Sequence, residues 1–271
     1  VMNAGELQNR GFDASLNIIA MQNLRKEFFW TVNANANRNR NKILKLSDYL
    51  KKVNEEQMKS ATAPLPQYHE GASTTTLYVV RSLGVDPVTG KEVYLKRDGT
   101  KTFTWDANDK VPVGDTNPKV SGTFSTSINW KDLSCTLGFT YKYGGIVYNQ
   151  TLADKIENQN VAYNLDNRAG QGRWERPGDV TSYVGFSPTG ANTPASTRFI
   201  MNDNEVRLAT MSVGYRFTGE DFKLLRSASI DVLALNFTTN DIARLSPIRM
   251  ERGLDYPFAR SYTLSMSIMF R

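Results

Sequence analysis

The final segment of the chain alternates between apolar and small polar side chains. Between positions 261 and 267, every second residue is serine or threonine. The apolar positions of the segment are Tyr262, Leu264, Met266, Ile268 and Phe270. Because successive side chains of a β-strand point to opposite faces, this pattern predicts a strand with one apolar face and one small polar face. Such a strand lies either between lipid and water or at the edge of a soluble sandwich.

The same alternation recurs along the chain in segments of about ten residues, the length that a tilted strand needs to cross a bilayer. The solvent face of a soluble sandwich would be rich in Lys and Glu, whereas the polar positions here are mostly Ser, Thr, Asn and Gly. We therefore predict an all-β fold, a fragment of an antiparallel transmembrane β-barrel with about seven strands. The predicted strands are approximately 11–22, 26–37, 119–130, 133–145, 205–217, 227–241 and 261–271.

Short and long connections alternate between these strands. The long connections are residues 38–118, 146–204 and 242–260, and the connections between them are short turns. This asymmetry is typical of outer-membrane barrels, which have tight periplasmic turns and long extracellular loops. If the last strand ends in the periplasm, all three long connections lie outside the cell.

The long connections have local structure of their own. Ser47 is placed to cap a short helix with a thin apolar stripe. Turn residues flank the alternating pieces Lys91–Lys96 and Thr102–Trp105, which predicts a small hairpin. Thr151 and Asp154 have the spacing of a capping box and predict a second short helix. We expect these elements to be parts of loops and not separate domains.

Several classes of function are excluded by composition. A single cysteine, Cys135, and a single histidine, His69, leave no cluster for zinc and no catalytic triad, so we expect no enzyme activity and no cofactor or metal site. The net charge is +6, but the 33 Lys and Arg are scattered among 27 acids, which argues against nucleic-acid binding. The chain begins at Val1 without the features of a signal peptide, so we expect a processed chain or a piece of a longer one.

Four separated motifs, in order along the chain, resemble a known family. Residues 5–13 are similar to the strand-entry signature of TonB-dependent transporters. Residues 81–94, 176–183 and 252–264 resemble the C-terminal region of the SusC/RagA branch of these transporters, which is found in Bacteroidetes. The resemblance implies a plugged barrel of about 22 strands, of which this chain is the C-terminal third or so. The plug, the segment that meets TonB and the remaining strands would then lie outside these 271 residues.

The resemblance also implies a function and a set of partners. Such a transporter lies in the outer membrane of a Gram-negative bacterium and imports a glycan or a peptide, with energy delivered through TonB. A SusD-like lipoprotein would cover its extracellular mouth, and outer-membrane lipid would surround it. Two alternatives stay open: a passive porin or autotransporter barrel, and a soluble all-β carbohydrate-binding module. The isolated soluble module would fold alone, without detergent.

Candidate functional residues follow from this interpretation. Aromatic rings stack on sugar faces and arginine donates in a fork to hydroxyls or carboxylates, so both residue types in the loops are candidates for contact with substrate or lid. The alternative for each is that it packs the loops together. Lys142 and Arg216 are expected to line the lumen or to pair with acids of the plug, and Phe270 is expected to act as an assembly signal. The loop candidates are Tyr68, Trp105, Arg173, Trp174, Arg176, Tyr183, Arg252 and Tyr256.

Overall fold

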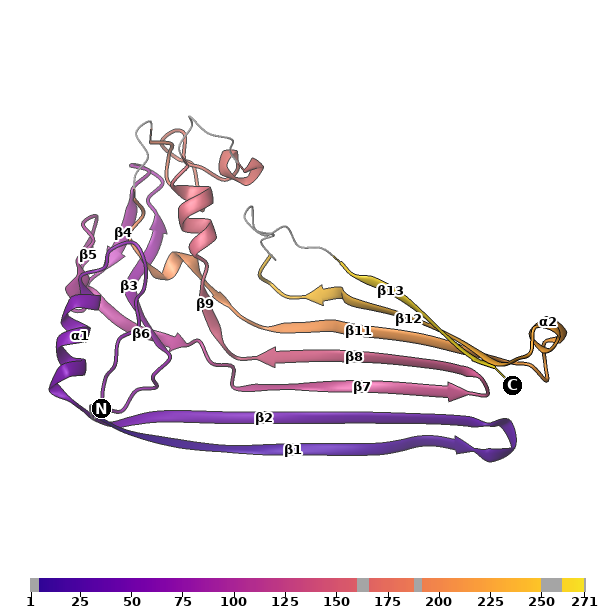
Figure 1. The fold of residues 1–271 in the computed structure, drawn as a ribbon. Helices are drawn as coiled ribbons and strands as arrows, with labels where there is room; N and C mark the ends of the chain where they lie inside the picture. The colour runs from indigo at the N-terminus through magenta and orange to yellow at the C-terminus, as the bar shows by residue number, and fades with distance from the viewer. Residues whose placement is uncertain (1–4, 160–165, 188–191, 250–259, 271) are drawn as a thin grey trace. The chain divides into compact units, whose positions relative to one another are not determined.

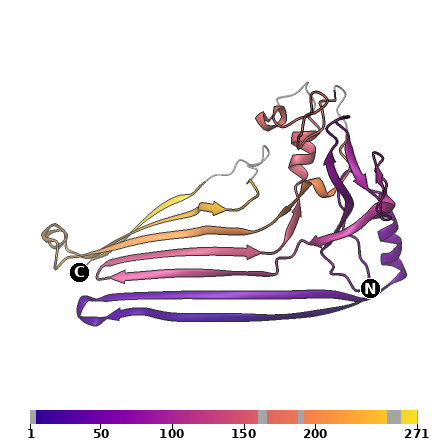
Figure 2. The same ribbon diagram turned by 180° about the vertical axis from the view of Figure 1, so that it is seen from behind.

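The structure is a computed structural model that describes residues 5–159, 166–187, 192–249 and 260–270. The chain divides into two compact units, drawn as ribbons in Figures 1 and 2. We call residues 1–10, 40–118 and 145–203 the loop unit. Residues 11–39, 119–144 and 204–271 form the sheet unit. Two long strands contribute residues to both units, and each unit is described by itself below.

A seven-stranded sheet runs through the sheet unit, and its strands from β2 to β13 pair antiparallel with their neighbours. This confirms the predicted all-β fold class. In spatial order the strands are β1 (Gly5–Asn23), β2 (Phe28–Leu46), β7 (Val120–Trp130), β8 (Leu133–Tyr143), β11 (Glu205–Thr218), β12 (Ile230–Leu245) and β13 (Tyr262–Phe270).

The first two strands are longer than the sequence predicted. Both β1 and β2 run for 19 residues, so the first long connection begins after residue 46 and not at residue 38. The missed part of β2 carries Arg, Asn and Lys in place of an apolar alternation. A β-ladder is held by backbone hydrogen bonds, so it continues through a polar run that shows no period-two signal.

Pairing in register turns the alternation of each strand into rows that cross the sheet. Directly paired residues lie on the same face of a sheet. One row on the apolar face is Trp30, Ile128, Cys135, Val213, Phe237 and Leu264. The next row, on the polar face, is Thr31, Ser127, Thr136, Ser212, Thr238 and Thr263.

A β-bulge in β11 interrupts this alternation. The register shifts between Leu208 and Thr210, so Ala209 has no partner in either ladder. Strict alternation from Met211 would place Ala209 on the apolar face. The bulge puts Leu208 opposite Phe139 on that face instead. A bulge inserts one extra residue and thereby reverses the face of every residue beyond it.

Hydrophobic burial is confined to the loop unit. Every buried hydrophobic side chain among the described residues belongs to that unit. In the sheet unit, large apolar side chains remain exposed: Leu264 is 71% exposed and Met266 is 64% exposed. A contiguous exposed apolar face of this kind marks a surface that meets another apolar phase.

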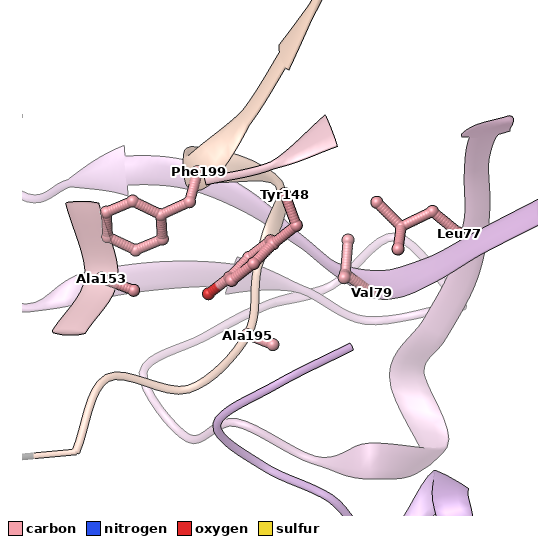
Figure 3. Packing of buried hydrophobic residues seen from close by; sticks show 6 residues of the cluster. All are labelled: Leu77, Val79, Tyr148, Ala153, Ala195 and Phe199. Atoms are coloured by element: carbon pink, nitrogen blue, oxygen red, sulfur yellow. The ribbon is translucent and has the colours of Figure 1, made fainter. Parts of the chain in front are cut away.

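The loop unit has its own small sheet and core. Its four-stranded sheet has the order β5 (Lys101–Thr102), β4 (Glu92–Leu95), β3 (Thr76–Val85) and β6 (Lys110–Asp115), and β9 (Ile146–Tyr148) pairs with β10 (Ile200–Asn202). Tyr148 and Phe199 meet edge to face, with ring centroids 6.0 Å apart. Figure 3 shows the cluster around them, which consists of Leu77, Val79, Tyr148, Ala153, Ala195 and Phe199.

The described helices are all short. The two α-helices are α1 (Asp48–Met58) and α2 (Lys223–Ser227), and η3 (Leu152–Glu157) is a π-helix. The 3₁₀ turns are η1 (Leu24–Lys26), η2 (Ala107–Asp109), η4 (Asn167–Gly170) and η5 (Thr197–Phe199). Among the described residues, no helix has the length and apolar character needed to cross a membrane.

The local predictions for the loops had mixed outcomes. The Oγ atom of Ser47 accepts a hydrogen bond from the Leu50 N–H at 3.4 Å, and the hairpin is present as β4 and β5. The capping box at Thr151 is wrong, because Thr151 already has helical backbone angles and its side chain caps nothing. Asp154 instead accepts a hydrogen bond from the Gln150 side chain at 2.9 Å.

Candidate functional site

The polar face of the sheet carries a charged band near one end. We call this end, where the long connections leave the strands, the loop end, and we call the opposite end the turn end. Arg244 Nε lies 2.7 Å from Glu205 Oε2, and Arg207 forms an ion pair with Asp241. Lys142 lies opposite Glu205 in the ladder between β8 and β11. These five residues, Lys142, Glu205, Arg207, Asp241 and Arg244, are the charged band.

The bulge in β11 creates much of this band. Counted by strict alternation from Ser212 and Thr210, Arg207 would lie on the apolar face. Because of the bulge, Arg207 instead pairs with Thr140 and Arg244 on the polar face. No local pattern marks the bulge, and the strand that holds Arg244 and Asp241 alternates only weakly, so four of the five residues were missed.

An open hollow of about 310 Å³ lies beside the charged band. Its lining comes from three neighbouring strands: Tyr141, Lys142, Tyr143, Asn204, Glu205, Val206, Leu245, Ser246 and Pro247. Tyr141, Tyr143, Val206 and Leu245 share the apolar face in the pairing register, so the hollow opens mainly on that face. The charged band lies on the opposite, polar face and carries both signs of charge.

The two predicted lumen cations lie at opposite ends of the sheet and do not form one site. Lys142 belongs to the charged band at the loop end, whereas Arg216 lies near the end of β11 that leads into the turn. Arg216 Nε lies 2.9 Å from Asp132 Oδ1, and its N–H donates to the Asp132 carbonyl at 3.0 Å. Arg216 thus already has an acidic partner within its own sheet, in the turn between β7 and β8.

Two of the predicted loop contacts are used to hold the loop unit together. Arg173 is only 6% exposed, and its guanidinium donates to the carbonyls of Ala169, Ile156, Glu157 and Val184. Trp174 Nε1 donates to the Pro87 carbonyl at 2.9 Å. The indole covers Gly90, where a Cβ would lie 2.4 Å from the ring. The geometry of both side chains fits the packing alternative.

Three other candidates are half-buried. Tyr68 is held through its backbone by Asn54, whose side chain bonds to both its N–H and its carbonyl. Trp105 Nε1 donates to the Ala195 carbonyl at 3.1 Å. Tyr183 packs against the loop-unit core, and burial raises the pKa of its phenol, with the nearby Glu157 carboxylate adding to the shift.

Arg176 is the described loop candidate with the most open side chain. Its side chain is 86% exposed, and its Nε lies 3.8 Å from Asp179 Oδ1. A neighbouring side chain, Val180, is 88% exposed. The remaining loop candidates, Arg252 and Tyr256, lie outside the described residues. Phe270 is 66% exposed and pairs with Ile230 at the turn end.

A buried ion cluster in the loop unit was not predicted at all. Arg198 Nη2 lies 2.8 Å from Glu92 Oε2 and 2.5 Å from Glu157 Oε1, and Nη1 donates to the Ser182 carbonyl at 2.9 Å. The three side chains are at most 9% exposed. Burial raises the pKa of the Glu157 carboxyl, although the hydrogen bond from Arg198 opposes that shift.

The cluster joins segments that are far apart in the sequence. Glu92 comes from β4, Glu157 from the end of η3 and Arg198 from η5, so Arg198 and Glu92 are separated by 106 positions. In β4 the buried residues are Glu92 and Tyr94, and the apolar Val93 and Leu95 beside them are only partly buried. No local sequence pattern indicates such a contact.

A second buried cation closes the end of α1. Lys110 is 1% exposed, and its Nζ donates to the carbonyls of Met58 and Ser60 at 2.8 Å each. The ammonium lies 5.6 Å from the centroid of the Trp105 ring. Carbonyls at the C-terminus of a helix have no intrahelical partner, so a cation there satisfies them and interacts favourably with the helix dipole.

Lys110→Met is expected to destabilise the loop unit by about 1–3 kcal/mol, because two buried carbonyls lose their partner. Hydrogen exchange of α1 in the intact protein measures the effect. Lys52→Met, which changes an exposed lysine of the same helix, is the control. Equal protection of α1 in the two variants would contradict the assignment of Lys110 as its cap.

The described residues contain no group of three or more His, Cys, Asp or Glu side chains suited to a metal ion. The free thiol of Cys135 lies on the apolar face of the sheet.

Comparison with known proteins identifies relatives of the chain. No family model matches it. The TonB-dependent receptor P3 of Formosa agariphila is 24% identical, over an alignment that covers 100% of this chain and 29% of the receptor. The TonB-dependent receptor P26 of the same organism is 25% identical, with 100% and 30% covered. The chain thus spans less than a third of the length of these curated relatives.

Solved structures agree in fold. The RagAB peptide transporter matches with a TM-score of 0.71 at 20% identity, covering 90% of this chain and 26% of that chain. The RagAB peptide importer in the closed-closed state matches with a TM-score of 0.72 at 20% identity, covering 98% and 30%. The predicted resemblance to TonB-dependent receptors is confirmed by the curated relatives, and the fold is that of part of the RagAB structures.

Proposed function

We propose that residues 1–271 form the C-terminal part of the barrel of an outer-membrane transporter that works with TonB. One observation carries this proposal: the sheet unit has a continuous exposed apolar face opposite a face of small polar residues. Lipid on one side and a water-filled lumen on the other satisfy both faces. The match to TonB-dependent receptors along the whole chain supports the same assignment.

The edges of the sheet are part of the proposal. β1 and β13 lie at the two ends of the strand order, so each has one side without a neighbour in the sheet. Backbone groups at the depth of a bilayer need hydrogen-bond partners, and open edges do not occur there. Further strands of the longer protein would pair with both edges and close the barrel. The long connections would then stand on the extracellular side.

The imported ligand is proposed to be a peptide, with a glycan as the second candidate. The charged band on the polar face offers both cations and anions. A peptide carries charges of both signs, which suits such a band better than a neutral sugar does. The similar RagAB proteins are named peptide importers. A SusD-like lipoprotein is proposed to cover the mouth, with exposed Arg176 among its contacts.

The test uses the full-length protein in its own cells. Membrane fractionation should recover it in the outer membrane together with a surface lipoprotein. Uptake of labelled peptides should stop when TonB is inactivated, and uptake that continues without TonB would indicate a passive porin. Recovery of the protein in the soluble fraction would support the carbohydrate-binding module and overturn the proposal.

Phe270→Asp is expected to block assembly of the transporter. Phe270 ends the apolar series of β13 near the membrane boundary, where a charge costs the folded state only about 0–1 kcal/mol. A large loss of outer-membrane protein would therefore reflect failed recognition of the last strand during assembly. Quantitative blotting of outer membranes measures this, with Ser267→Asp on the other face as the control. Normal levels of Phe270→Asp protein would refute the role of Phe270 as a signal.

A further inference from the structure

The connections at the turn end of the sheet share one composition. Each combines an exposed apolar side chain with neighbouring basic residues. In η1, Leu24 is 71% exposed and precedes Arg25 and Lys26. In the turn after β7, Trp130 is 52% exposed and precedes Lys131. Figure 1 shows η1, the turn after β7 and α2 at the same end of the sheet.

The third connection forms the helix α2, which has the same composition. Leu224 is 84% exposed and lies between Lys223 and Arg226. Phe222, just before the helix, meets Phe217 edge to face, with ring centroids 5.1 Å apart. Phe217 pairs with Leu233, which pairs in turn with Ile268, on the apolar face of the sheet. The contact between the two phenylalanines therefore places the start of α2 on the apolar side of the sheet.

The five basic side chains of these connections are unpaired. Arg25, Lys26, Lys131, Lys223 and Arg226 form no ion pair with any residue that the structure describes.

Two acids of the same connections have their partners on the polar face. Asp132 is paired with Arg216, and Asp221 accepts a hydrogen bond from the Thr218 hydroxyl. Arg216 and Thr218 follow Ser212 and Gly214 at every second position, on the polar face. Glu27 and Glu220 are the other acids. The five basic side chains therefore outnumber the acids Glu27 and Glu220. They are adjacent in sequence to the exposed apolar side chains.

We propose that the turn end is a binding surface for anionic phospholipid headgroups. Leucine, phenylalanine and tryptophan side chains enter the acyl region, and the lysine and arginine side chains beside them reach the phosphate layer. Each basic residue near an anionic leaflet strengthens binding on the order of fivefold. The inference rests on the proposed function, because it requires the apolar face of the sheet to meet lipid.

The experiment uses the full-length transporter in nanodiscs of phosphatidylcholine with a minor fraction of phosphatidylglycerol. Lipid that remains bound is identified by native mass spectrometry. Wild-type protein should retain phosphatidylglycerol at several times its share of the bilayer. The variant Lys223→Glu/Arg226→Glu should lose this enrichment by fivefold or more, and Lys223→Gln/Arg226→Gln should lose part of it. The control Lys119→Glu/Arg249→Glu changes two exposed cations at the loop end and should keep the enrichment.

Two outcomes would overturn the inference. One is retention of phosphatidylglycerol at its bulk share by the wild-type protein, and the other is equal enrichment in wild type and the α2 charge-reversal variant. Failure of the proposed function is a separate result, because a protein that does not enter the outer membrane is detected by fractionation before any lipid is measured. Gel mobility with and without heating shows that each variant is folded.

Discussion

Replacing Val213 by arginine is expected to destabilise the full-length transporter by about 2–4 kcal/mol, the cost of a cation at the middle of the lipid face of a barrel. Val213 lies in a row of the apolar face that runs from Trp30 to Leu264. Its position in the middle of β11 allows the arginine little opportunity to reach either membrane boundary. Unfolding by urea in lipid bilayers measures the change in the free energy of unfolding.

Ser212→Arg is the matched control for this prediction. Ser212 is the adjacent residue on the polar face, and its hydroxyl lies 2.9 Å from the Asn236 side-chain oxygen. Losing that interaction costs about 0.5–1.5 kcal/mol, and the new guanidinium projects into water. Equal destabilisation by the two substitutions would contradict the assignment of one lipid face and one lumen face, and would indicate a sheet that is covered on both sides.

Arg198→Met is expected to unfold the loop unit locally while the sheet stays in the membrane. Without Arg198, the carboxylates of Glu92 and Glu157 remain buried without their ion-pair partner, and breaking a buried pair in this way costs about 3–5 kcal/mol. Hydrogen exchange measured across residues 76–115 and 146–202 should show the loss of protection. Peptide uptake should fall with it.

Two variants separate this effect from a general loss of charge. The triple variant Glu92→Gln/Glu157→Gln/Arg198→Met removes all three charges together and should recover most of the protection. Lys51→Met removes one partner of an exposed pair, in which Lys51 and Asp48 are 58% and 92% exposed, and should leave protection unchanged. If the triple variant is as unprotected as the single one, uncompensated charge is not the cause of the unfolding.

The alternation of side chains predicted the sheet well because solvation acts on every residue of such a strand. An apolar residue on the lumen face or a polar residue on the lipid face is costly. Apolar and polar residues therefore alternate with period two along β7, β8 and β13. A strand segment without this difference in solvation shows no period-two pattern. The polar half of β2 was missed for this reason, since its ladder continues through alternating Asn and Arg.

The bulge and the loop contacts were beyond sequence reasoning for other reasons. Ala209 is compatible with either face, so nothing in its surroundings marked the extra residue that turns Arg207 toward the polar face. The contacts of Arg198 and Arg173 join distant segments and depend on how the loops fold over one another. Residue type alone also failed to separate exposed Arg176 from buried Arg173.

Cysteine accessibility along β11 tests whether the sheet separates lipid from a watery lumen. The native Cys135 lies on the apolar face and is first replaced by alanine. Single cysteines at positions 210 to 217 of the full-length protein are then treated, in intact outer membranes, with a charged maleimide that cannot enter lipid. The account predicts labelling at 210, 212, 214 and 216 and protection at 211, 213, 215 and 217. Uniform labelling, or the opposite alternation, would contradict it.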